Sequence, residues 1–134
     1  MANGRVLIVE DDPALVHAIE RNLSVRGFET RSAASVAEAL AALDEGSPSL
    51  LLLDIDLPDG SGWEVLRALR AAGPSSTAVI VISALRPNER LAKDLRCVAV
   101  LEKPFPMDSL LRLITENLAP APDRGTYPSA ANKP

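Results

Sequence analysis

Acidic side chains stand directly after two short apolar runs of the sequence. They are Glu10, Asp11 and Asp12 after the first run, and Asp54, Asp56 and Asp59 after the second. Two other apolar runs end near the hydroxyl of Ser83 and the ammonium of Lys103. Carboxylates that lie close together raise each other's pKa unless a cation neutralises them, and Mg²⁺ prefers oxygen ligands of this kind. The set therefore points to phosphoryl transfer, which needs positioning and charge neutralisation more than covalent help.

The chemistry of such a site would centre on Asp54. A carboxylate that attacks phosphorus forms an aspartyl-phosphate. Lys103 adds a positive point charge and Ser83 offers a hydroxyl donor. Each acidic cluster alone is also consistent with a solvated loop, because loops carry polar residues. The joint occurrence of acids, hydroxyl and ammonium after four different runs favours a functional site.

These side chains meet only if the apolar runs are parallel strands, because parallel strands end at the same edge of a sheet. The runs are 6–9, 50–53, 78–82 and 98–101. Each is continuous rather than alternating, which is typical of strands covered by helices on both faces. The segment 28–31 alternates between apolar and polar residues and predicts a half-exposed edge strand.

Segments with helical periodicity lie between the predicted strands. Capping signals predict helices that begin at Pro13, after Ser35 and after Ser61. A weaker pattern predicts a helix over 87–95, and a stripe of apolar residues predicts the last helix over 106–118. The predicted inward residues are Leu15, Ile19 and Leu23, then Val36, Leu40 and Leu43, and in the last helix Leu110, Leu111, Ile114 and Leu118. Five βα units in this order predict an α/β fold, with a parallel sheet between two layers of helices.

The composition limits the function further. The chain has 134 residues, about one domain, and a net charge of -4, so we expect no direct nucleic-acid binding through a positive face. One cysteine excludes an internal disulfide, and no run is long enough for a membrane span or a signal peptide, so we expect no membrane insertion and a cytoplasmic location. The Pro- and Ala-rich segment 119–134 predicts a flexible tail after a single domain at 1–118.

Four motifs of the chain resemble those of the response-regulator receiver domains of two-component signalling, over residues 5–118. They are 6–12 (VLIVEDD), 51–62 (LLLDIDLPDGSG), 79–84 (VIVISA) and 103–105 (KPF). The resemblance implies the CheY-like, flavodoxin-like fold. This is a doubly wound, five-stranded parallel sheet of order 2-1-3-4-5, with five helices in a three-layer α/β/α sandwich.

The same resemblance implies a role for each residue of the predicted site. Asp54 matches the phospho-accepting aspartate, Ser83 the switch hydroxyl and Lys103 the lysine that contacts the phosphoryl group. The implied Mg²⁺ ligands are Asp11, Asp54, the main-chain carbonyl of Asp56, and Glu10, the last mainly through water. The Lys103–Pro104 peptide bond is expected to be cis.

The implied function is a stand-alone phosphorelay switch rather than a turnover enzyme. Asp54 would take a phosphoryl group from a sensor histidine kinase or a phosphotransfer protein, and the phosphorylated form would change its affinity for an output partner. Only self-phosphorylation and self-dephosphorylation would be catalysed. A homodimer through the predicted elements 87–95, 98–101 and 106–118 is one arrangement that this family allows.

Other functions stay open at this point. Family members usually carry Tyr or Phe three residues before the lysine, where this chain has Val100. The chain could therefore be an atypical receiver that binds partners without phosphorylation. Asp54-Ile55-Asp56 also resembles the nucleophile motif of haloacid-dehalogenase-type phosphatases, and the spaced acids faintly resemble the toprim metal site. The phosphatases usually carry a late acidic motif after the lysine, where this chain has only Asp108 nearby. The net acidity of the chain and Lys103-Pro104 argue against the toprim site.

Overall fold

The apolar runs form one parallel sheet in the computed structural model, which describes residues 4–73, 75–85 and 88–118. Its strands are β1 (Arg5–Val9), β2 (Glu29–Ala33), β3 (Leu50–Asp54), β6 (Ala78–Ser83) and β7 (Ala99–Glu102). Their spatial order is β2-β1-β3-β6-β7, which confirms the predicted order 2-1-3-4-5. The labels differ because a small antiparallel hairpin, β4 (Asp56–Leu57) with β5 (Gly60–Ser61), follows β3 in the chain.

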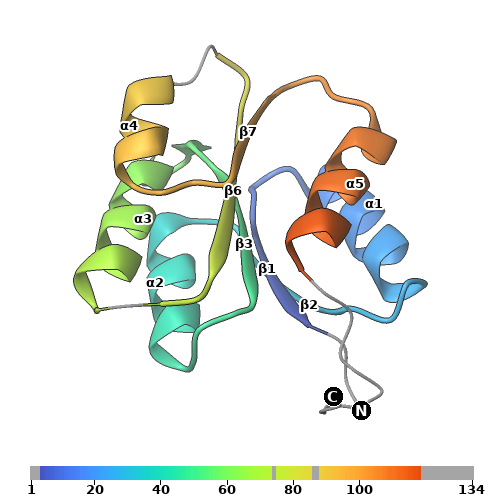
Figure 1. Cartoon of the computed structure of the whole chain (residues 1–134), viewed down its shortest axis with the longest axis horizontal. Helices are drawn as coiled ribbons and strands as arrows, with labels where there is room; N and C mark the ends of the chain where they lie inside the picture. The colour runs from blue at the N-terminus through green and yellow to red at the C-terminus, as the bar shows by residue number, and fades with distance from the viewer. Residues whose placement is uncertain (1–3, 74, 86–87, 119–134) are drawn as a thin grey trace.

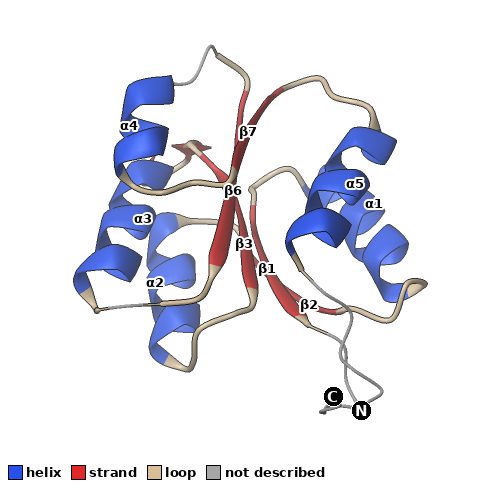
Figure 2. Ribbon diagram, viewed as in Figure 1, coloured by secondary structure: helices blue, strands red, loops and turns tan. Residues whose placement is uncertain are grey.

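Helices cover both faces of the sheet and complete the predicted α/β/α sandwich (Figure 1). They are α1 (Pro13–Ser24), α2 (Val36–Asp44), α3 (Gly62–Ala71), α4 (Glu89–Asp94) and α5 (Met107–Asn117). Figure 2 shows α1 and α5 together on one side of the strands, and α2, α3 and α4 on the other. Among the described residues, no helix has the length and apolar character needed to cross a bilayer.

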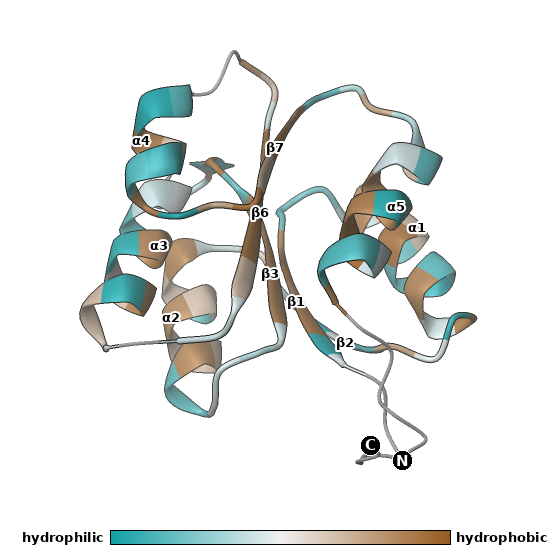
Figure 3. Ribbon diagram, in the orientation of Figure 1, coloured by the Kyte–Doolittle hydropathy of each residue, from teal (hydrophilic) through white to brown (hydrophobic). Residues whose placement is uncertain are grey.

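Two hydrophobic cores form because alternate side chains of a strand point to opposite faces. On β3, Leu50 and Leu52 belong to the core beneath α1 and α5, whereas Leu51 and Leu53 belong to the core beneath α2 and α3. In Figure 3 the central strands are largely brown and lie between helices that carry both brown and teal residues. Burial on both faces explains why this run is continuously apolar in the sequence.

Helix capping follows the predictions closely. Ser35 accepts a hydrogen bond from the Glu38 amide at 3.1 Å, and Ser61 forms a full capping box with Glu64. The weakest predicted helix is shorter than expected, because α4 starts at Glu89 after the cap Asn88. The first residue of that prediction, residue 87, and the predicted tail 119–134 lie outside the described residues.

The inward residues of α2 differ from the prediction. Ala39 and Ala42 are buried beside Val36, whereas Leu40 and Leu43 are only partly buried against the same core. Small alanine side chains let this helix lie close to the sheet, and the leucines then cover its flanks. In α1, Val16 is buried and the predicted Leu15 is only partly buried, while the inward residues of α5 are all buried as predicted.

The last strand also departs from the prediction. β7 begins at Ala99 rather than at residue 98, and the side chain of Val98 is 46% exposed. β7 is an edge strand that pairs only with β6, so its first three residues are half-buried and Glu102 is exposed.

Candidate functional site

The strand register brings the predicted site residues to one edge of the sheet. Val9 pairs with Leu53, so Glu10, which follows β1, lies at the same level as Asp54, the last residue of β3. On the other side of β3, Asp54 pairs with Ile82, the residue before Ser83. Ser83 in turn pairs with Glu102, the residue before Lys103. The parallel topology therefore gathers side chains that are up to 93 residues apart in sequence, from Glu10 to Lys103.

Three carboxylates converge at this edge. One oxygen from each of Glu10, Asp11 and Asp54 lies within 4.8 Å of the others. Glu10 and Asp54 are each only 2% exposed, whereas Asp11 is exposed to solvent. Burial, with a contribution from the Asp54 charge, raises the pKa of Glu10 against the opposing effects of Lys103 and the Asp12 amide. The cluster therefore stores like-charge repulsion that a cation can relieve.

Lys103 reaches the carboxylates from the end of β7. Its Nζ lies 2.6 Å from Glu10 Oε1 and 3.2 Å from Asp54 Oδ2. Burial lowers the pKa of Lys103, but the close contact with Glu10 and the charges of both acids outweigh this effect, so the pKa is raised overall. The Lys103–Pro104 bond is cis, as predicted. The ammonium therefore stays charged and partly neutralises the two buried acids.

The carboxylate of Asp54 is oriented on both oxygens. Oδ1 accepts a hydrogen bond from the Asp56 amide at 3.0 Å, and Oδ2 accepts one from Lys103. The main chain beside Asp54 is close to the start of α3, since a Cβ at Gly62 would overlap the Asp54 carbonyl oxygen. Glycine is required there because α3 begins against the end of β3.

Ser83 lies at this edge but does not hydrogen-bond to Asp54. Its side chain is buried at the end of β6, with a residue exposure of 3%. Its Oγ donates a hydrogen bond to Asp56 Oδ2 at 3.4 Å and accepts one from the Leu85 amide at 3.3 Å. The hydroxyl is thus held by the residue two positions after Asp54.

The residues present fit a hard dication. Glu10 Oε1 is buried and has no donor in hydrogen-bonding geometry, so its contact with Lys103 is an ion pair rather than a directed hydrogen bond. Together with Asp11 and Asp54 it offers only oxygen ligands, and one or two such carboxylates are typical of Mg²⁺ sites. The donor set is therefore suited to Mg²⁺, with part of the coordination left to water.

Two acids of the sequence clusters serve helices instead of the metal group. Asp12 caps α1 by accepting a hydrogen bond from the Ala14 amide at 3.0 Å. Asp59 accepts hydrogen bonds from the amides of Val36 at 2.7 Å and Ala37 at 3.1 Å, at the start of α2. These bonds lower the pKa of Asp59. The hydrogen bond between Asp59 and Val36 joins residues 23 positions apart, and no motif of the sequence predicts it.

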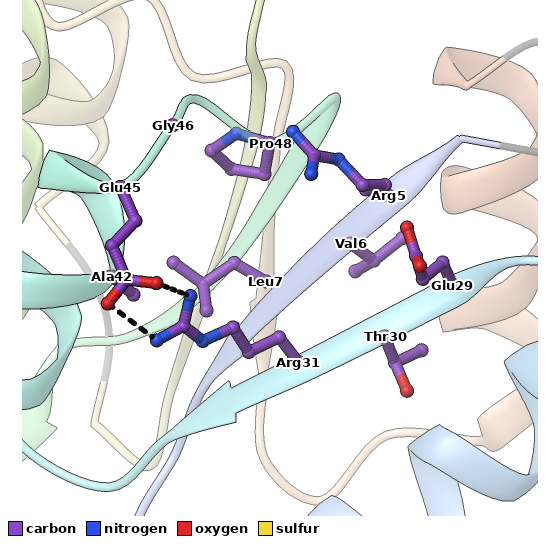
Figure 4. Close-up of a pocket in the computed structure, with 10 residues that line it drawn as sticks. All are labelled: Arg5, Val6, Leu7, Glu29, Thr30, Arg31, Ala42, Glu45, Gly46 and Pro48. Atoms are coloured by element: carbon purple, nitrogen blue, oxygen red, sulfur yellow. Dashed lines mark hydrogen bonds and ion pairs between the residues drawn. The ribbon is translucent and has the colours of Figure 1, made fainter.

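A separate cavity of about 340 Å³ lies beside β1 and β2 (Figure 4). Arg5, Glu29, Arg31 and Glu45 provide its charged lining, and none of the predicted site residues lines it. Arg31 pairs with Glu45 at 2.7 Å, and both side chains are largely exposed. Exposed pairs of this kind add little stability. The predicted site residues therefore lie at the carboxyl ends of the strands and not in this cavity.

Comparison with known proteins agrees with this geometry. The family model of the response regulator receiver domain matches residues 6–115. The chain is 39% identical over 108 residues to the transcriptional regulatory protein KdpE of Mycobacterium tuberculosis (strain CDC 1551 / Oshkosh), covering 79% of this chain and 47% of that protein. It is 35% identical over 133 residues to the uncharacterized transcriptional regulatory protein YkoG of Bacillus subtilis, covering 95% of this chain and 58% of that protein. The chain thus spans about half the length of these curated relatives.

Solved structures show the same fold. A CheY-like receiver domain protein from Methanospirillum hungatei superposes with a TM-score of 0.78 at 30% identity, covering 84% of this chain and 91% of that one. The response regulator TrrA of Thermotoga maritima, crystallised in complex with Mg²⁺-BeF, has a TM-score of 0.75 at 26% identity, covering 86% and 99%. With the sequence match over 6–115, these findings show that the chain belongs to the response regulator receiver domain family.

Proposed function

We propose that Asp54 accepts a phosphoryl group and that this chain works as the phosphorylation switch of a two-component system. The observation that carries the proposal is the environment of Asp54. A buried carboxylate lies 3.2 Å from the Lys103 ammonium and beside two further acids at the carboxyl edge of a parallel sheet. This arrangement supports a nucleophilic role for Asp54, because the charges that a phosphoryl group needs lie beside its carboxylate.

The reaction is an in-line displacement at phosphorus. One carboxylate oxygen of Asp54 forms the new P–O bond while the P–N bond of a phosphohistidine breaks, and the leaving imidazole keeps the electron pair and takes a proton from water. Lys103 pairs with a phosphoryl oxygen, and the Ser83 hydroxyl donates a hydrogen bond to another. The Asp56 amide orients the attacking carboxylate through its 3.0 Å hydrogen bond.

A divalent cation completes the proposed site. Asp11, Asp54, the main-chain carbonyl of Asp56 and, through water, Glu10 would hold Mg²⁺, which supplies charge neutralisation of the phosphoryl oxygens. The match of these residues to a hard dication supports this part of the proposal. It is also supported by the Mg²⁺-BeF complex of TrrA, a structural relative.

The proposed partners follow from this chemistry. A sensor histidine kinase or a phosphotransfer protein would supply the phosphoryl group to a receiver unit at 1–118. An output partner, or an output domain of the kind that transcriptional relatives such as KdpE imply by name, would read the change. We propose that the receiver unit itself makes no contact with nucleic acid, because the net charge of the chain is -4.

The proposal is tested by intact-mass measurement after incubation with acetyl phosphate and Mg²⁺. We expect an adduct of about 80 Da on the wild-type chain, and none on Asp54→Asn or in EDTA. Asp44→Asn serves as the matched control, because Asp44 is exposed at the end of α2 and should leave the adduct unchanged.

Other results would identify the rival functions. If no donor, including a panel of histidine kinases, yields an adduct, the phosphorylation-independent interaction module replaces the switch. Sustained turnover of small phosphate esters would instead indicate a phosphatase. An adduct that persists in Asp54→Asn would move the acceptor to another residue.

A further inference from the structure

The side chain of Asp56 has a contact that the proposed function does not use. Its main-chain carbonyl is the proposed metal ligand, and its amide orients Asp54, but its carboxylate accepts the hydrogen bond of Ser83. The carboxylate is exposed at the surface, whereas Ser83 is buried. The exposed carboxylate of Asp56 therefore accepts the hydrogen bond of Ser83, which is the only side-chain hydroxyl in the proposed mechanism.

The local fold fixes Asp56 in this position. Asp56 lies in β4, which pairs with β5 so that Asp56 is opposite Ser61. Ser61 caps α3, and Glu64 closes the capping box on the Ser61 amide at 3.0 Å. The hairpin and the start of α3 therefore restrain the backbone of Asp56 and keep its carboxylate near the end of β6.

The hydroxyl of Ser83 has a single proton to donate. Its oxygen already accepts the Leu85 amide, and its proton is directed to Asp56 Oδ2. A phosphoryl group on Asp54 would need the same proton. Asp56 and the phosphoryl group are thus competing acceptors for one donor.

We propose that Asp56 is a positioning residue that holds Ser83 in the resting state and must release it when Asp54 is phosphorylated. This inference rests on the proposed function, because the phosphoryl group is the competing acceptor. The Asp56 carboxylate thereby raises the free energy needed to bring the Ser83 hydroxyl to the phosphoryl group. It weakens the phosphorylated state relative to the resting state without taking part in the transfer itself.

The expected effect is modest because the hydrogen bond is long. Hydrogen bonds to charged groups are stronger than neutral ones, but a separation of 3.4 Å is near the outer limit. Loss of the Asp56 carboxylate should therefore tighten binding of a phosphoryl mimic by about three- to tenfold.

The experiment measures the equilibrium affinity for beryllofluoride in the presence of Mg²⁺, by ¹⁹F NMR of the bound species. The variants are Asp56→Ala, Asp56→Asn, Ser83→Ala and the double variant Asp56→Ala with Ser83→Ala. Alanine and asparagine both keep the main-chain carbonyl and amide of residue 56. Asp44→Ala is the control for the loss of one negative charge, and thermal melting checks that every variant is folded.

A double-mutant cycle separates competition for Ser83 from simple charge repulsion. We expect Asp56→Ala to lower the dissociation constant in the Ser83 background and to have a clearly smaller effect when Ser83 is alanine. Asp56→Asn, whose amide oxygen still accepts from Ser83, should fall between the wild type and Asp56→Ala. Asp44→Ala should match the wild type.

Two results would overturn the inference while leaving the phosphoryl site intact. One is an unchanged dissociation constant in Asp56→Ala, and the other is the same change in both backgrounds, which would mean that Asp56 acts through charge alone. If the wild type does not bind beryllofluoride, or binds it as well as Asp54→Asn does, the proposed function fails and this inference fails with it.

Discussion

Replacing Lys103 with methionine should destabilise the metal-free protein. The variant keeps an apolar stem of similar length but removes the ammonium between Glu10 and Asp54. Both acids are then left buried beside each other without a counter-charge. The folded state loses an attraction that the unfolded chain, with its acids in water, never had.

The size of the effect follows from the distances. At an effective dielectric constant of about 20, unit charges 2.6 and 3.2 Å apart attract by roughly 6 and 5 kcal/mol. Desolvation of the ammonium offsets much of this attraction. Removing one partner of a buried ion pair typically costs about 3–5 kcal/mol. Because the Lys103 side chain is still 23% exposed, we expect a loss near the lower limit, about 3 kcal/mol.

The pH dependence follows from the raised pKa of Glu10. The folded state binds the Glu10 proton more tightly than the unfolded chain, so the Glu10 contribution to stability improves as the pH falls through its folded pKa. Without Lys103, one influence that lowers this pKa is lost, and the pKa rises further. The destabilisation should therefore be larger at about pH 8 than at about pH 5.

Urea unfolding followed by circular dichroism measures this effect, in EDTA and in Mg²⁺. Lys93→Met is the matched control, because Lys93 is an exposed lysine of α4 outside the site. Mg²⁺ should restore part of the stability of Lys103→Met, since it binds only the folded carboxylate cluster. An equal or higher free energy of unfolding for Lys103→Met in EDTA would refute the reasoning, because it would show that the ammonium gains nothing from the two acids.

Two further predictions concern Asp59 and Cys97. Asp59→Asn should lower the urea midpoint by weakening the acceptor for the Val36 and Ala37 amides. Because these bonds lower the Asp59 pKa, its contribution is present above the unfolded pKa and is lost as the pH falls through the folded pKa, so the two midpoints should converge in acid. Burial raises the pKa of the Cys97 thiol from 9.0 to about 11. At pH 8, iodoacetamide should therefore alkylate the native protein about 100-fold more slowly than the unfolded chain, as followed by mass spectrometry.

Each of these predictions has a clear negative result. A midpoint difference for Asp59→Asn that is constant across the acid range would show that the Asp59 charge does not stabilise α2. Asp44→Asn, at the other end of that helix, controls for the change in net charge. Equal alkylation rates of native and unfolded protein would show that Cys97 is not shielded in the folded state.

The sheet could be predicted because its strands are apolar on both faces. Each of the runs at β1, β3 and β6 is continuous, and helices cover both sides of the sheet. Once the strands are parallel, their carboxyl ends must share an edge, so the sequence alone predicts that Glu10 and Asp54 lie at that edge. The neighbouring positions of β1 and β3 needed the family resemblance, since sequence runs alone do not order strands.

The inner face of α2 could not be read from hydrophobicity. Leucine is more apolar than alanine, so a periodic pattern selects Leu40 and Leu43. The structure instead buries Ala39 and Ala42, because the depth of a helix on a sheet depends on side-chain size at the contact. Which residues of α2 are buried therefore depends on the packing distance between the helix and the sheet and not on side-chain polarity.

The contacts of the Asp56 and Asp59 side chains also could not be predicted from the sequence. The hairpin of β4 and β5 has only two residues in each strand, too few for a periodic pattern. Asp59 binds α2 across 22 and 23 residues, and Asp56 binds Ser83 across 27. Such long-range polar contacts depend on the register of the finished fold.

The hydrogen bonds that hold Asp59 are shorter than those that hold Ser83. On one side of Asp54, the loop is anchored by two short hydrogen bonds from Asp59 to the amides of Val36 and Ala37. On the other side, Ser83 is held by two long ones, at 3.3 and 3.4 Å. Because hydrogen bonds weaken as they lengthen, separating Ser83 from Asp56 and Leu85 should cost less free energy than separating Asp59 from the start of α2.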